Sequence, residues 1–272
     1  MIIDVNQTTA NMKNDFEILY NGARKYTATL PFITVSGAFN IDNLKKIKVF
    51  DTENNLKFSS EYNYIENQVE ELIPLKYLAT KSQKFCQIKF INNTDGSEIY
   101  IFFAMEAVWD GKFIIKLNDK IYKGYSIEDG YIRHVCIYDD ETQIAELLKP
   151  NVLIDGKDTY RTYLKDEYAN LSDAIVMLSL YLDRTEYSSS YIKNKSISYE
   201  KKFSYSKANT YYNPNWIKEN FECTDYFNQI DGLVNEVKQK IKNTAKSIFL
   251  AFGIVMALVI IIAVLILTTV LL

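Results

Sequence analysis

A histidine and a cysteine two residues apart are the first candidates for chemistry in this sequence. His134 is the single histidine of the 272-residue chain, and Cys136 follows it in an apolar run. On a β-strand both side chains share a face, but residues i and i+2 are about 6–7 Å apart, too far for a base to deprotonate a thiol directly. The other cysteines, Cys86 and Cys223, are scattered and give no zinc-binding spacing. We therefore expect no catalytic pair, no metal and no cofactor.

Two loops resemble chemical motifs but do not complete them. The segment from Gly124 to Glu128 contains Gly-x-Ser but lacks the second glycine of a nucleophile elbow. The segment from Asp51 to Asn55 imitates the start of a calcium-binding loop, but Leu56 replaces the required glycine and Tyr62 the required glutamate. These departures favour a protein that is not an enzyme.

The apolar run from Ile248 to Leu272 contains no charged residue and indicates where the protein works. It exceeds the roughly 20 residues that a helix needs to cross a bilayer. Lys238, Lys240, Lys242 and Lys246 precede it, so the positive-inside rule predicts that the N-terminal part stays cytoplasmic. The N-terminus lacks the pattern of a signal peptide. We therefore predict a tail-anchored, single-pass membrane protein.

Short runs of β-branched and aromatic residues fill residues 15–165 and are separated by Asn, Asp and Gly at the turns. Alternation is visible around Phe113 and Ile115, which share a face between lysines. The runs predict a meander of eleven antiparallel strands: Phe16–Tyr20, Tyr26–Val35, Leu44–Phe50, Leu56–Tyr64, Phe85–Ile91, Glu98–Ala107, Lys112–Leu117, Ile121–Ile127, Tyr131–Tyr138, Gln143–Leu148 and Thr159–Lys165.

The strand pattern breaks at residues 171–184, a predicted helix that is apolar on every side. It is too short to span a membrane, so it must be surrounded by protein. A sheet that closes around the helix buries it and removes exposed strand edges. We predict a mainly β fold, a closed antiparallel barrel of about twelve strands around this helix; an open β-sandwich with the helix on one face is the alternative. The predicted buried positions are Ile175, Val176, Met177, Leu178, Leu180 and Tyr181.

Three segments carry a family resemblance: HVCIYDDETQIAELLKP (His134–Pro150), DTYRTYLKDEYANL (Asp158–Leu171) and SDAIVMLSLYLDRTEY (Ser172–Tyr187). Their order resembles the end of domains in the tubby-like superfamily, within it the LURP-one-related and phospholipid-scramblase branch. In that superfamily a closed barrel encloses a hydrophobic helix. The resemblance covers residues 15–187 and implies about twelve strands, the missing strand or a short helix falling in Glu66–Ala79.

The resemblance also implies a ligand, because tubby relatives bind phosphoinositides through basic residues. Lysines on strands are commonly only solvated or guard a sheet edge, and that alternative stays open. The net charge of −3 does not suggest nucleic acid as a partner. The candidate headgroup-binding lysines are Lys112, Lys116, Lys120 and Lys123, with Lys45, Lys46 and Lys48.

The predicted organisation has five parts: an N-terminal arm (1–14), the barrel (15–187), a linker rich in Ser, Tyr, Lys and Asn (188–215), a juxtamembrane amphipathic helix (216–247) and the anchor (248–272). We expect the barrel to bind lipid headgroups or a protein partner. The alternatives are scramblase-like lipid transport, suggested by the family alone, and tethering or oligomerisation through the juxtamembrane helix. The sequence leaves the oligomeric state open.

Overall fold

A computed structural model covers the chain and describes residues 1–10, 13–31, 46–62, 83–107, 110–154, 157–187, 206–222, 225–236, 238–239 and 242–244. The chain divides into two compact units, Met1–Thr224 and Asp225–Leu272.

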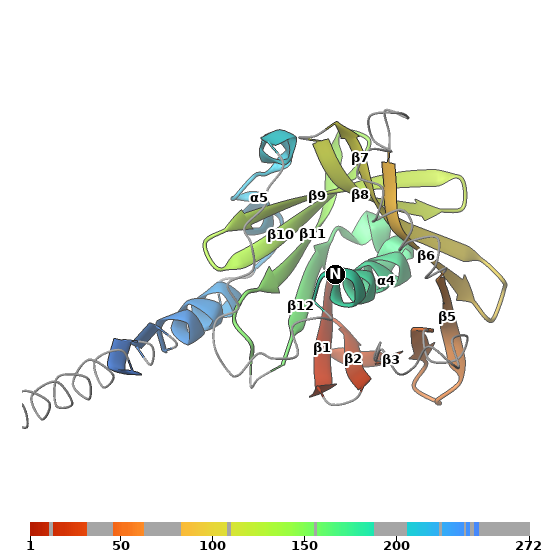
Figure 1. Cartoon of the computed structure of the whole chain (residues 1–272), viewed down its shortest axis with the longest axis horizontal. Coiled ribbons are helices and arrows are strands. Elements are labelled where there is room, and N and C mark those ends of the chain that lie inside the picture. The colour runs from red at the N-terminus through yellow and green to blue at the C-terminus, as the bar shows by residue number, and fades with distance from the viewer. Residues whose placement is uncertain are drawn as a thin grey trace, which may run out of the picture. The chain divides into compact units, whose positions relative to one another are not determined.

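The first unit contains a closed barrel of twelve antiparallel strands (Figure 1). Each strand pairs with its neighbours in sequence, and β1 pairs with β12 to close the ring. The closed ring confirms the predicted barrel and excludes the open sandwich. The strands are β1 (Ile2–Ala10), β2 (Lys13–Tyr20), β3 (Ala23–Pro31), β4 (Lys48–Phe50), β5 (Leu56–Tyr62), β6 (Gln83–Asn92), β7 (Glu98–Ala107), β8 (Asp110–Leu117), β9 (Lys120–Asp129), β10 (Ile132–Asp139), β11 (Thr142–Pro150) and β12 (Thr159–Leu164).

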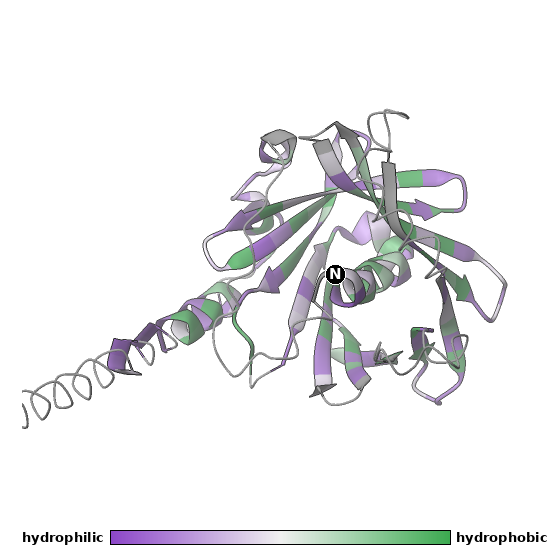
Figure 2. Ribbon diagram, viewed as in Figure 1, coloured by the Kyte–Doolittle hydropathy of each residue, from purple (hydrophilic) through white to green (hydrophobic). Residues whose placement is uncertain are grey.

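Hydrophilic and hydrophobic residues alternate along several strands (Figure 2), as expected where successive side chains point to opposite faces of the barrel wall. On β8, Phe113 and Ile115 belong to the interior core, and on β10 Val135 and Ile137 do the same. The strand order follows the predicted runs for β2 to β12, because each run holds enough inward-facing apolar residues to mark it as a strand.

The helix α4 (Ser172–Leu182) lies in the middle of the ring (Figure 1). The segment η2 (Asp166–Leu171) precedes it and η3 (Asp183–Tyr187) follows it. All its residues from Ala174 to Leu182 are buried. At its start, Asp173 Oδ1 accepts hydrogen bonds from the hydroxyls of Tyr20 (2.9 Å) and Tyr26 (3.1 Å). At its end, Asp183 accepts a hydrogen bond from Tyr160. The wall therefore holds both ends of the helix that fills it.

The N-terminal arm expected at residues 1–14 is corrected by the structure. Residues Ile2–Ala10 form β1, the twelfth strand, which lies between β2 and β12. Ile3 and Val5 face the core, but the polar Gln7 faces inward as well, and Asp4, Asn6, Thr8 and Thr9 are also polar. Because so many of its residues are polar, the segment lacks the apolar pattern by which the other strands were predicted. The alternative location, Glu66–Ala79, lies outside the described residues.

The expected linker and juxtamembrane helix also differ from the structure. Within the linker range, η4 (Ser206–Tyr211) packs against β8 and β9. The helix predicted to run from residue 216 starts as α5 (Trp216–Asn220) but ends at Phe221, whose backbone is extended. In the second unit, residues 225–236 are helical.

The predicted anchor, Ile248–Leu272, lies outside the described residues. Within the described part of the chain, no helix combines the length and apolar character needed to cross a membrane.

Candidate functional site

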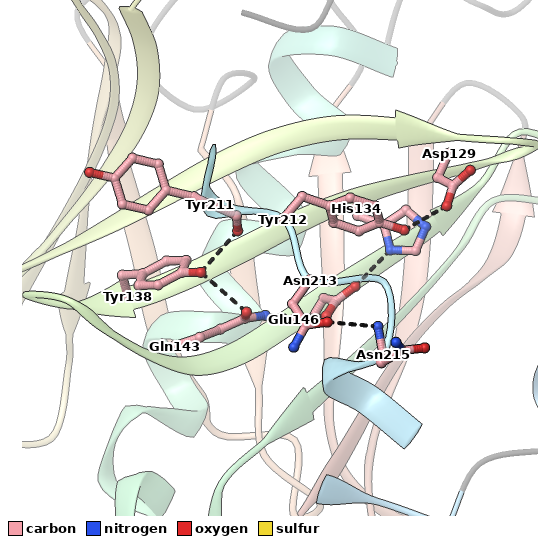
Figure 3. Close-up of polar contacts among 9 residues, drawn as sticks. All are labelled: Asp129, His134, Tyr138, Gln143, Glu146, Tyr211, Tyr212, Asn213 and Asn215. Carbon is pink, nitrogen blue, oxygen red and sulfur yellow. Dashed lines mark hydrogen bonds and ion pairs between the residues drawn. The ribbon is translucent and has the colours of Figure 1, made fainter. Parts of the chain in front are cut away.

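The most developed polar site lies on the outside of the barrel, on β9, β10 and β11 (Figure 3). Here the outward-facing Tyr125, Cys136 and Tyr138 form a buried cluster with Ala208, separate from the barrel interior. We call the outward face of these three strands the outer wall, and the segment that lies on it, residues 206–221, the strap.

Three side chains of the outer wall form a hydrogen-bonded chain. Glu146 of β11 is 2% exposed, and its Oε1 lies 2.7 Å from Nδ1 of His134 on β10. Its other oxygen, Oε2, accepts a hydrogen bond of 3.2 Å from Nε2 of Gln143. Both carboxylate oxygens of this buried glutamate therefore have partners on the barrel itself, as a buried charge requires.

Two tyrosines attach the strap to the wall. The ring of Tyr211 stacks on Tyr125, with centroids 4.0 Å apart and planes 7° apart. Tyr138 donates a hydrogen bond of 2.9 Å to the carbonyl oxygen of Tyr211. Tyr212 crosses His134 at 5.1 Å between ring centroids, and its hydroxyl donates to Oδ2 of Asp129 at 2.7 Å. Figure 3 shows the hydrogen bonds that Tyr138 and Tyr212 make between the strap and the wall.

The strap continues to a second aromatic contact. Trp216 and Ile217 are buried, and Phe221 lies 5.7 Å from Trp216 between ring centroids. Phe221 also contacts Tyr163 of β12, with centroids 5.2 Å apart. Aromatic rings thus contact the barrel at both ends of the strap.

The electrostatics of the outer wall disfavour a catalytic thiol. Burial, with a smaller contribution from Glu146, raises the pKa of the Cys136 thiol well above its ordinary value. A reactive cysteine needs the opposite shift, toward the thiolate. Burial likewise raises the pKa of Tyr138 to about 12, so its hydroxyl keeps its proton and donates. The predicted strand placement of His134 and Cys136 on one face holds, and the arrangement suits binding by hydrogen bonds and ring contacts.

The four candidate headgroup-binding lysines do not form one exposed cluster. Lys112 is only 5% exposed. Lys120 forms an ion pair of 2.5 Å with Asp139, and Lys116 lies 6.0 Å from the ring centroid of Tyr100. Lys123 is half-buried on β9. Lys46 and Lys48 are half-buried near β4, and Lys45 lies outside the described residues.

The predicted buried residues of the helix lie in the first unit, and the predicted membrane-flanking lysines belong to the second. In the barrel, Ile175, Val176, Met177, Leu178, Leu180 and Tyr181 are each at most 1% exposed. In the second unit, Lys238 and Lys242 are exposed, whereas Lys240 and Lys246 lie outside the described residues.

A second polar group, which the sequence did not suggest, lies inside the barrel at the end of α4. We call Asn14, Lys149, Asp158, Tyr160 and Asp183 the polar plug. Asp183, which is 1% exposed, accepts hydrogen bonds from Tyr160 (2.9 Å) and Asn14 Nδ2 (3.3 Å). Lys149 Nζ forms a 2.6 Å ion pair with Asp158. Burial, then the charge of Asp158, raises the pKa of Asp183 to about 6.

One signal could have located part of these sites. Glu146 and Lys149 are three residues apart on one strand, among apolar neighbours. Their side chains therefore point to opposite faces of the sheet. The contact of Asn14 with Asp183 and that of Tyr125 with Tyr211 join segments far apart in the sequence, and no local pattern predicts them. Among the described residues, no group of three His, Cys, Asp or Glu is placed to hold a metal ion.

Comparison of the chain with protein-family models, curated proteins and solved structures found no significant match. The tubby-like resemblance therefore stays a prediction.

Proposed function

We propose that this chain is a single-pass membrane protein whose barrel is a non-enzymatic binding module. The observation that carries the binding part is that α4 occupies the barrel interior, with every residue from Ala174 to Leu182 buried. Ligands therefore have to meet the outside of the barrel or its rims. The uncharged run from Ile248 to Leu272 supports the membrane part, with the barrel in the cytoplasm.

A protein partner is favoured over a lipid headgroup. Headgroup binding by several lysines needs cations that can approach one phosphate together. Lys112 is buried and Lys120 is paired with Asp139, so these two are not available in that way. The outer wall instead offers aromatic rings and buried polar groups, the composition of protein interfaces.

The anchor is tested with the full chain in isolated membranes. We expect the protein to resist carbonate extraction, and Ile261→Arg with Val264→Arg to release it, because each arginine costs about 2.5–3.5 kcal/mol at the centre of a span. Ile261→Leu with Val264→Leu is the matched control. Wild-type protein that washes off the membrane, or a barrel that protease cannot reach from the cytoplasmic side, contradicts the membrane part.

The lipid alternative is tested on the same membranes. Soluble inositol phosphate is titrated against the full chain and against Lys116→Glu with Lys123→Glu. Binding that the double substitution abolishes would replace the protein partner by a lipid headgroup. We expect no saturable binding by either protein.

A further inference from the structure

The strap is attached to the outer wall as a peptide ligand is attached to a receptor. Its 3-10 segment, η4, is only six residues long and gains little from its own backbone. The stacked ring of Tyr211, the hydroxyl of Tyr212 and the buried Ala208 make the specific contacts. Such a small number of rigid aromatic anchors is typical of peptide recognition.

The polar groups of the wall beneath the strap can stay hydrogen-bonded when the strap leaves. Glu146 is bonded to His134 and Gln143, both on the barrel, so both of its carboxylate oxygens keep a hydrogen-bond partner when the strap is absent. The hydroxyl groups of Tyr138 and Tyr212, which bond between wall and strap, can bond to water instead. Glu146 therefore keeps both hydrogen bonds in either state, whereas loss of the partners of a buried charge is the usual obstacle to opening a packed surface.

We propose that the outer wall is a peptide-binding site and that its occupant is the strap, supplied either by the same chain or by a second copy of it. A second copy presents the same residues to the same wall, so exchange forms the same contacts that the structure shows. The connection between Tyr187 and Ser206 has 18 residues (188 to 205) and can span at most about 65 Å. This length permits a strap to reach a neighbouring barrel.

The surface density of the protein in the membrane sets the balance between binding of a chain's own strap and binding of the strap of a second copy. A tethered strap has an effective concentration in the millimolar range, so exchange becomes favourable when copies are crowded, as in the plane of a membrane. The inference deepens the binding part of the proposed function and rests on it. The anchor is tested by extraction and the wall by thiol labelling, so either can fail without the other.

Cys136 provides a built-in reporter, because it lies on the wall under the strap and is 1% exposed. A receptor form of the full chain carries Cys86→Ser and Cys223→Ser, so that Cys136 is its only thiol, with Tyr211→Ala and Tyr212→Ala to release its strap. We expect a thiol reagent to label Cys136 in this receptor more than about tenfold faster than in the same chain with both tyrosines intact.

A donor form supplies the strap in trans. It carries Cys86→Ser, Cys136→Ala and Cys223→Ser, so that it has no thiol, and Tyr125→Ala, so that its own wall does not retain Tyr211. When receptor and donor are reconstituted into the same vesicles, we expect labelling of the receptor to slow as the donor is increased, and to reach a plateau.

Three controls make the result decisive. A donor with Tyr211→Ala and Tyr212→Ala must give no protection, and a donor with Tyr100→Ala, a tyrosine of β7 that contacts Glu98, must protect fully. Labelling in urea identifies a receptor that has unfolded, because such a receptor reacts at the same rate with and without urea.

For that case the peptide of residues 206–221 is added to the chain with both tyrosines intact and is expected to slow labelling of Cys136. Absence of protection by both donor and peptide overturns the proposal.

Discussion

Replacing Asp183 by asparagine tests the electrostatics of the polar plug. The carboxylate is 1% exposed at the end of α4, and its pKa is about 6 against an ordinary value of 3.8. The folded protein therefore holds a proton at this site over a pH range in which the unfolded chain has lost it. The free energy of unfolding falls as the pH rises from about 4 to about 6, and the whole cost of the buried charge is present above that range.

The magnitude follows from the two pKa values. Their difference corresponds to about 3 kcal/mol of folding free energy at pH 8. Asparagine has no charge to bury and keeps an oxygen for the Tyr160 hydroxyl. Its amide can donate to Asn14 Oδ1, which has no partner among the described residues, after the Asn14 amide rotates by half a turn. We expect Asp183→Asn to be more stable than the wild type by up to about 3 kcal/mol at pH 8, and nearly equal to it at pH 4.

Thermal unfolding of the detergent-solubilised full chain between pH 4 and pH 8 measures this difference. For a unit of this size, about 3 kcal/mol corresponds to a rise in Tm of about 6–12 °C. Subtracting the wild-type curve removes the titration of all other groups that both proteins share. Tyr160→Phe is the companion variant: it removes a hydrogen bond that favours the charged form, so its loss of stability is greater at pH 8 than at pH 4.

An Asp183→Asn variant that is equally destabilised at both pH values would refute this reasoning. That outcome would mean that the carboxylate stays charged in the folded protein throughout the range. The neighbouring Lys149 would then compensate the burial more strongly than we infer.

Two further substitutions test the packing of the barrel. Leu178→Ala removes a side chain that is fully buried between α4 and the wall, so the free energy of unfolding should fall by about 2–5 kcal/mol, whereas the exposed Asn170→Ala changes it by less than about 0.5 kcal/mol; equal effects in urea unfolding would contradict the filled interior. Gly124→Val places a new Cβ 3.2 Å from Phe113 Cβ and Val135 Cγ1, and we expect a loss of about 1–3 kcal/mol, seen as a lower urea midpoint; an unchanged midpoint would show that β8 to β10 can spread apart.

Some features of the fold were determined by the sequence alone, because they depend on residues close together. The turns are an example: Asn, Asp and Gly were predicted to make them, and Asn54, Asn118, Asp140, Gly96 and Gly130 each have a positive φ. These residue types adopt that conformation at low cost. The short apolar runs between the turns marked β2 to β12 for the same local reason.

The central helix was also determined by its own composition. Residues from Ala174 to Leu182 are apolar on every side, so protein had to surround them. The curvature needed to surround a helix, together with the removal of free edges, favoured a closed barrel over an open sheet. This inference required no knowledge of which strands pair.

The tertiary structure alone decided which strand closes the barrel and which residues meet in the two polar sites. β1 looks polar by itself and becomes a strand because Ile2 meets Tyr163 of β12, a partner 161 residues away. The polar plug joins Asn14 to Asp183, and the outer wall joins Tyr125 to Tyr211. Hydrogen bonds and ring stacking act over a few ångströms, so such pairs exist only after the closed barrel has brought distant segments together.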